Sequence, residues 1–180
     1  MKKISIFLLL MAFFAPLAMN GQTSQTVSWG STSDNSGATT STQNSPFGRY
    51  YGWEYKVFCY RPNTLPFSGD ITKIEFLPAT TQSTAGTNTN SSITINGSAD
   101  SNPMQIWMKE VAGDFELDAS TAFSTYASGA TKVYSGNIPA TTAGTMTSFT
   151  LSTSFSHSQA NSLLILVRTV SNSNTGDGSL

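Results

Sequence analysis

The sequence predicts an all-β fold, an antiparallel β-sandwich of the jelly-roll type with about eight strands. Short segments alternate apolar and polar residues with the two-residue period of half-buried strands. Gly, Pro and Asn residues punctuate these segments at short intervals, as turns do in sandwiches. Only one short segment is typical of a helix. A chain of 180 residues is long enough for one such domain and its flanking segments.

The N-terminus is typical of a secretory signal. Two lysines follow Met1, residues 4–18 are almost wholly apolar, and small residues continue to Gly21. The apolar run of about 15 residues is shorter than the ~20 that a spanning helix needs, and Pro16 favours a signal over the alternative, a membrane anchor. We expect residues 1–21 to be removed and the mature protein to be secreted or held at the cell surface.

Residues 22–46 are rich in Ser, Thr, Asn and Gly and form an N-terminal segment before the sandwich domain. Within it, residues 25–29 alternate enough to predict one edge strand. Residues 31–45 cannot bury much apolar surface and are expected to be loop or linker. The sandwich domain is expected to span residues 47–180.

The first strand of the domain is expected over residues 49–60. One of its faces carries apolar and aromatic side chains at every second position: Trp53, Tyr55, Val57 and Cys59. The other face carries Glu54 and Lys56.

The second strand, expected over residues 70–77, puts Ile74 and Phe76 on one side and charged residues on the other. Pro78 ends it. A third strand over residues 92–96 runs into Asn96-Gly97, a strong hairpin signal.

The middle of the domain is expected to hold a strand over residues 104–109 and another over 131–134. Between them, residues 118–126 predict one or two helical turns, because Asp118 can begin a helix.

The last two strands are expected over residues 145–151 and 162–168. The first places Thr147, Phe149 and Leu151 on one face, and the second is a continuous apolar run, which predicts a central strand buried on both faces. We expect a core in which side chains of facing strands meet: Ile74, Phe76, Phe149, Leu151, Leu164 and Leu166.

Composition excludes several classes of function. A net charge of −1 with no basic stripe argues against nucleic acid and, in the mature form, against a membrane surface. The single Cys excludes an internal disulfide, and the single His leaves only one His-based triad, through His157. The chain has no G-x-S-x-G elbow, and His157 stands among serines that cannot fold back onto its ring. We expect an exposed loop histidine and no enzyme activity.

Several segments resemble a known kind of domain when read in order: I-T-K-I-E-F at residues 71–76, Q-I-W-M-K at 105–109, K-V-Y-S-G at 132–136, F-T-L-S-T-S-F at 149–155 and N-S-L-L-I-L-V at 161–167. The series resembles the N-terminal β-sandwich domain of large secreted Bacteroidota proteins, which are joined to fibronectin type III repeats and type IX sorting signals. It is also similar to jelly-roll adhesin modules of secreted peptidases.

The resemblance covers residues 50–169 and implies a fold, not an activity. The chain departs from the family pattern at Ser154, where the family usually has Pro, and in a longer loop over residues 79–103. The family follows its last matching strand with at least one more, so we expect a fragment that is truncated at its C-terminal end.

A carboxylate cluster is the candidate metal site: Glu110, Asp114, Glu116 and Asp118. Hard oxygen ligands at alternate positions suit calcium, although the spacing is not that of an EF-hand. A solvated loop and strand face is the alternative, and paired acids of a glycoside hydrolase are a third reading. Calcium is the one cofactor that the sequence leaves open.

Aromatic residues at the start of the domain are the candidate ligand site: Tyr50, Tyr51, Trp53 and Tyr60. Exposed rings could stack on sugars, with polar partners beside them. The alternative is that these rings are core or cover a sheet end. Cys59 is expected to be a buried thiol acting as a small hydrophobe, or to pair with a part of the protein outside this chain.

We expect a non-catalytic module for extracellular adhesion or for binding a glycan or a surface protein, monomeric and part of a longer chain. The alternative is an accessory domain of a secreted hydrolase whose catalytic domain lies outside this chain.

Overall fold

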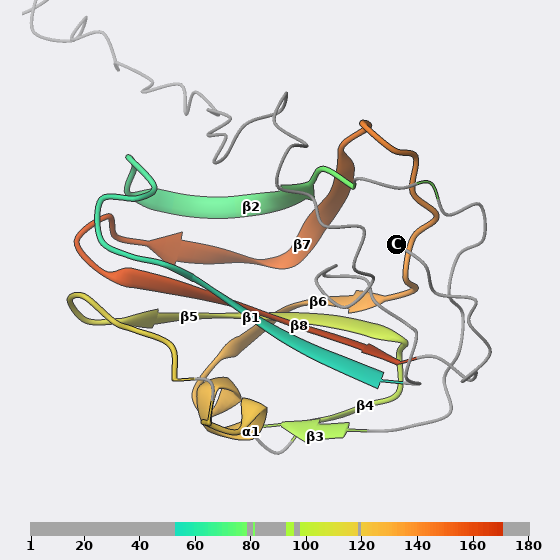
Figure 1. Ribbon diagram of the computed structural model, residues 1–180, viewed down its shortest axis with the longest axis horizontal. Helices are drawn as coiled ribbons and strands as arrows, with labels where there is room; N and C mark the ends of the chain where they lie inside the picture. Colours follow the sequence, from blue (N-terminus) through green and yellow to red (C-terminus); the bar gives the residue numbers. More distant parts are fainter. Residues whose placement is uncertain (1–52, 79–80, 82–92, 96–97, 119, 171–180) are drawn as a thin grey trace, which may run out of the picture.

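The computed structural model describes residues 53–78, 81, 93–95, 98–118 and 120–170 (Figure 1). The strands of this part are β1 (Trp53–Tyr60), β2 (Gly69–Phe76), β3 (Ile93–Ile95), β4 (Ser98–Asp100), β5 (Met104–Val111), β6 (Thr131–Gly136), β7 (Thr147–His157) and β8 (Ser162–Val170). The predicted signal peptide, the segment 22–46 and the strand over 25–29 lie outside the described residues. Each of the other expected strands is present, and β4 is an addition that the sequence did not predict.

The fold is an antiparallel all-β sandwich, as predicted. One layer is a four-stranded sheet in the order β1-β8-β5-β6, and the other is formed by β2 and β7. Figure 1 shows β2 and β7 stacked over the larger sheet. Strand β8 lies between β1 and β5, which confirms the central strand expected from its apolar run.

The main core fills the space between the two layers. Its buried members are Ile74, Met104, Ile106, Met108, Val133, Ile138, Phe149, Leu151, Leu163, Ile165 and Val167. The predicted positions of Ile74, Phe149 and Leu151 are confirmed, and Phe76 packs against the same cluster.

The face predicted for β8 is wrong. Leu164 and Leu166 lie on the opposite side of the sheet, in a second cluster with Trp107, whereas Leu163 and Ile165 face the interior. A strand that is apolar at every position has no alternation from which to read its orientation.

Helix α1 (Phe123–Ala127) covers the outer face of the four-stranded sheet. Its Tyr126 and Ala127 belong to the second cluster. The expected helical stretch is present but begins later than predicted, at Phe123. The carboxylate of Asp118 accepts hydrogen bonds from the backbone N–H and the hydroxyl of Ser120. Among the described residues no helix is long and apolar enough to span a membrane.

The hairpin predicted at Asn96-Gly97 is confirmed by the antiparallel pairing of β3 and β4 on either side of it. The carboxylate of Asp100, at the end of β4, lies 2.8 Å from the ammonium of Lys132 on β6. This ion pair ties the hairpin to the edge of the four-stranded sheet.

Candidate functional site

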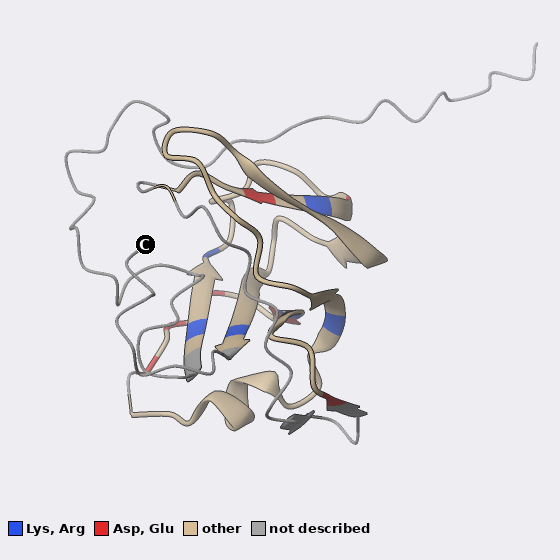
Figure 2. Ribbon diagram, turned by 90° about the vertical axis from the view of Figure 1, so that its right-hand side faces the viewer, with Lys and Arg blue, Asp and Glu red and all other residues tan. Residues whose placement is uncertain are grey.

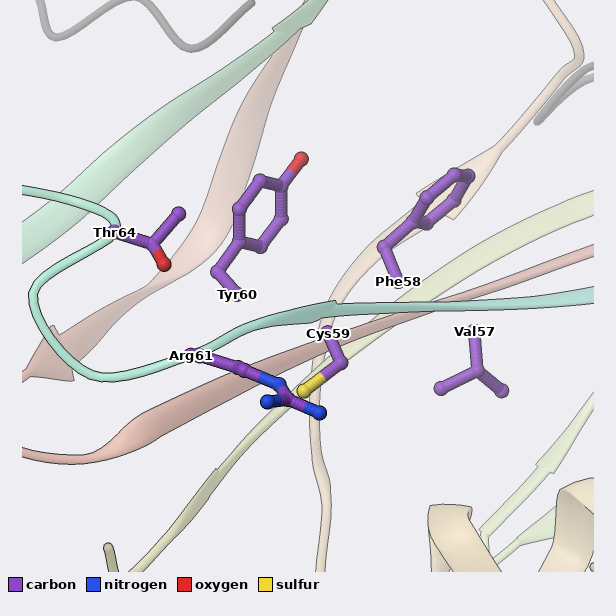
Figure 3. Close-up of a pocket in the computed structure, with 6 residues that line it drawn as sticks. All are labelled: Val57, Phe58, Cys59, Tyr60, Arg61 and Thr64. Carbon is purple, nitrogen blue, oxygen red and sulfur yellow. The ribbon is translucent and has the colours of Figure 1, made fainter. Parts of the chain in front are cut away.

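A hollow of about 550 Å³ opens along the second half of β1 and the turn that follows it (Figure 3). The hollow is lined by Val57, Phe58, Cys59, Tyr60, Arg61 and Thr64. Consecutive strand residues point to opposite faces of a sheet. A hollow that consecutive residues line must therefore have the edge of β1 itself as its floor.

The two walls of the hollow belong to different sides of the sheet. Phe58 and Tyr60 pack against the core between the layers, while Val57 and Cys59 pack against the second cluster on the outer face. Figure 3 shows the first pair on one side of the ribbon and the second pair on the other. Both walls are apolar in character, and all four side chains are half-buried.

Strand β1 stands at the border of its sheet. In the part of the chain that the structure describes, β8 is the strand hydrogen-bonded to β1, and no described strand lies on its other side. In an antiparallel pair, the N–H and C=O groups of alternate residues point away from the partner strand. Among the described residues no strand pairs with such outward groups between Val57 and Tyr60.

A small charged cluster sits at the end of the hollow, where β1 ends. The Nη2 atom of Arg61 lies 3.0 Å from Oε1 of Glu116, and its Nε atom lies 3.6 Å from Oδ1 of Asp114. The three side chains are 49%, 84% and 66% exposed, in the order Arg61, Glu116 and Asp114. Two carboxylates against one guanidinium leave the cluster with a negative excess.

Two titratable side chains of the hollow are partly withdrawn from solvent. Burial raises the pKa of the Tyr60 hydroxyl. Burial also raises the pKa of the Cys59 thiol, an effect that the nearby Arg61 opposes in part. The thiol donates to the backbone carbonyl oxygen of Phe115, at 3.4 Å. Cys59 is therefore half-buried, less enclosed than the buried thiol that the sequence predicted.

The aromatic platform expected for sugar rings is not assembled at Tyr60, whose ring packs against the core instead of lying exposed. Tyr50 and Tyr51 lie outside the described residues, and the structure describes only the backbone of Trp53. For those three residues the predicted role stays a prediction.

His157 is not the exposed loop residue that the sequence predicted. It ends β7, is only 5% exposed, and places Nδ1 at 2.9 Å from Oε1 of Glu110. The ring of Phe67 meets it edge-on, with the ring centres 5.2 Å apart. Nε2, the atom that would activate a serine in a triad, is buried without a hydrogen-bond partner among the described residues.

Glu110 gathers the turn between β7 and β8 around its carboxylate. It accepts hydrogen bonds from the backbone N–H of Ser158 and, at 2.8 Å, from the side-chain amide of Asn161. Burial alone would raise the pKa of Glu110, but the hydrogen bonds from Asn161, Ser158 and His157 outweigh it and hold that pKa below its ordinary value. Glu110 thus fastens the end of β7 to β5.

The four carboxylates predicted as a calcium site do not converge. Glu110 binds the turn beside His157, Asp114 and Glu116 pair with Arg61, and Asp118 accepts from Ser120. Those hydrogen bonds lower the pKa of Asp118. Within the described ranges no group of three or more His, Cys, Asp or Glu side chains is placed to hold a metal ion. The structure therefore does not bring these four residues together, and calcium binding there stays a prediction.

Comparisons of the chain with models of protein families, with curated proteins and with solved structures found no match. The resemblance to secreted Bacteroidota domains stays a prediction.

Sequence reasoning missed the hollow and the burial of His157 for different reasons. The alternation of β7 continues from Phe149 through Leu151 and Phe155 to His157, and this signal could have placed the imidazole on the inner face. The hollow had no such signal, because it depends on which strand ends at the border of the sheet.

Proposed function

We propose that the protein is a secreted, non-catalytic β-sandwich module that binds an extracellular ligand in the hollow along β1, and so serves in adhesion. One observation carries the proposal: the hollow lies on the border of a sheet, with two apolar walls and an exposed charged cluster at its end. Concave, mostly apolar sites with a few polar groups at one end are the usual form of a ligand site.

The few and scattered charges on the rest of the protein favour a partner that is recognised by shape more than by charge. Charged residues make up 11% of the chain, and in Figure 2 they lie scattered along strands and loops. A border strand with open backbone groups also invites unwanted pairing, and proteins usually cover or charge such edges. A binding role would give a function to the edge of β1, on which no described strand lies.

Binding can be tested with the protein purified from the medium of cells that express the full chain. We would screen it on a glycan array and against displayed peptides, beside two single variants. Thr64→Phe fills the hollow, whereas Thr150→Phe adds the same ring at an exposed position of β7 in the other layer. We expect Thr64→Phe to abolish binding of the ligands found and Thr150→Phe to leave it intact. Equal binding by both variants would contradict the proposal.

Export has its own test. The secreted protein is expected to have lost about 20 residues, as signal cleavage removes them. N-terminal sequencing of the secreted material that began at Met1 would contradict a cleaved signal.

A further inference from the structure

We infer that the ligand of the hollow is an extended peptide segment, apolar in its centre and carrying Lys or Arg at one end, which adds as a strand to the edge of β1. The inference rests on the proposed function, since it names the partner class for the same hollow.

The floor of the hollow selects a peptide backbone. Residues Val57 to Tyr60 line it from both sides of the sheet, so the backbone groups along its length are the N–H and C=O groups of β1 that point away from β8 and that no described strand pairs with. An extended peptide satisfies such groups in the same pattern in which β8 satisfies those on the opposite side. A sugar has no regular array of donors and acceptors at this spacing.

The walls select the side chains. An added strand would place alternate residues beside Phe58 and Tyr60, and the residues between them beside Val57 and Cys59. Both walls are apolar, so apolar or β-branched residues are favoured at consecutive positions of the peptide. Since Tyr60 packs its ring into the core, this hollow has no exposed flat ring on which a sugar could stack.

The charged cluster favours a basic residue at one end of the peptide. Asp114 and Glu116 share the single guanidinium of Arg61, and both carboxylates are mostly exposed. A Lys or Arg side chain there would be attracted by the negative excess, and an acidic side chain would be repelled.

Two synthetic peptides test the inference: Lys-Val-Tyr-Val-Thr-Val-Lys and its twin with Glu in place of both Lys. Binding is read from the anisotropy of labelled peptide and from alkylation of Cys59 by iodoacetamide. Cys59 lies in the hollow and is the only cysteine of the chain, so its alkylation reports on this site. The reaction is run near pH 9, because burial raises the pKa of the thiol.

We expect the Lys peptide to bind and to slow alkylation of Cys59, and the Glu peptide to bind at least about fivefold more weakly. The double variant Asp114→Asn, Glu116→Gln should lower the affinity for the Lys peptide by about fivefold, which corresponds to about 1 kcal/mol, one exposed ion pair. Glu75→Gln removes a carboxylate from the outer face of the β2–β7 layer and should leave the affinity unchanged.

Backbone pairing is tested by two further peptides, N-methylated on one or the other set of alternate amides. Methylation of the set that faces β1 should abolish binding, and methylation of the opposite set should not. Equal binding by both methylated peptides would show that no strand is added.

The remaining outcomes separate this inference from the proposed function. A glycan that shields Cys59 while neither peptide does would overturn the peptide and keep the binding site. Shielding that grows with protein concentration alone, together with dimers in sedimentation, would identify a second copy as the occupant and overturn the inference. If no peptide and no arrayed glycan shields Cys59, both proposals are wrong.

Discussion

Strands β1 and β8 are neighbours in the four-stranded sheet, yet they differ in the number of strands that pair with them and in the burial of their side chains. They pair antiparallel in unbroken register, from Trp53 opposite Val170 to Tyr60 opposite Leu163. Strand β8 has a hydrogen-bonded strand on each side, and its residues 163–169 are all buried. Strand β1 has one described partner, and its residues 55–60 are all half-buried. We therefore expect β8 to contribute more to the stability of the fold than β1, and β1 carries the proposed binding site.

The largest expected effect lies in the layer that faces β8. Phe149 is 2% exposed, and its ring meets those of Tyr134 and Phe76 edge-on, with ring centres 5.0 Å and 5.9 Å apart. Phe149→Ala should lower the free energy of unfolding by about 3–5 kcal/mol, because it leaves a cavity between the layers. Urea unfolding measures this, and a loss under about 1 kcal/mol would mean that the layers do not share one core.

A matched pair of substitutions tests the comparison itself, since Val57 and Leu166 lie opposite each other in the register. Leu166 is fully buried, so Leu166→Ala should cost about 2–5 kcal/mol. Val57→Ala removes a half-buried side chain from the border strand and should cost about 1 kcal/mol or less. Similar losses for the two variants would show that β1 supports the fold as much as β8 does.

Low pH tests the region where β8 begins. There the carboxylate of Glu110 holds the turn that precedes the strand. Its pKa is lowered in the folded protein, so its contribution is complete above the ordinary carboxyl value of 4.5 and is lost as the pH falls through the folded value. Glu110→Gln should cost about 1–3 kcal/mol at pH 7, and the difference from the unsubstituted protein should be smaller at pH 3, where protonation of Glu110 begins to remove its charge.

Urea unfolding at both pH values measures the difference, with Glu116→Gln as the control for an exposed carboxylate paired only with Arg61. A loss of stability in Glu110→Gln that is the same at both pH values would contradict a role for the charge.

Calcium should have the smallest effect, because the carboxylates between β5 and α1 are divided among separate partners. Melting curves recorded in millimolar calcium and in chelator should coincide, since an ion stabilises a protein only where the folded form binds it. A higher melting temperature in calcium, lost in Asp114→Asn with Asp118→Asn, would restore the metal site.

The sequence was sufficient for strands that carry a clear period or a long apolar run. The alternation at Ile74 and Phe76 and that at Phe149 and Leu151 placed these side chains correctly. It was insufficient where apolar residues do not alternate with polar ones. The run over residues 162–168 predicted a central strand but not which leucines face inward. Strand β4 was missed because Ser98, Ala99 and Asp100 have little preference for strands and pair only through their hairpin.

The candidate site was less predictable because tertiary pairing creates it. Arg61 is distant in sequence from Asp114 and Glu116, and nothing in their spacing joins them. The acidic run between Glu110 and Asp118 suggested convergence on an ion, but each side chain pairs with a nearer donor in a turn or just after β1. The same run therefore supplies the carboxylate that holds the turn after β7 and the two carboxylates that lie at the end of the hollow.

Amide hydrogen exchange resolved to single residues tests most directly whether the edge of β1 is the binding surface. In the free protein, the amides of residues 163–167 should exchange slowly, whereas alternate amides between Val57 and Tyr60 should exchange fast, because they point away from β8. Addition of the Lys peptide should slow those alternate β1 amides and leave the β2–β7 layer unchanged. Alternate β1 amides that are already protected in the free protein, or protection that appears only in β2 and β7, would contradict the account.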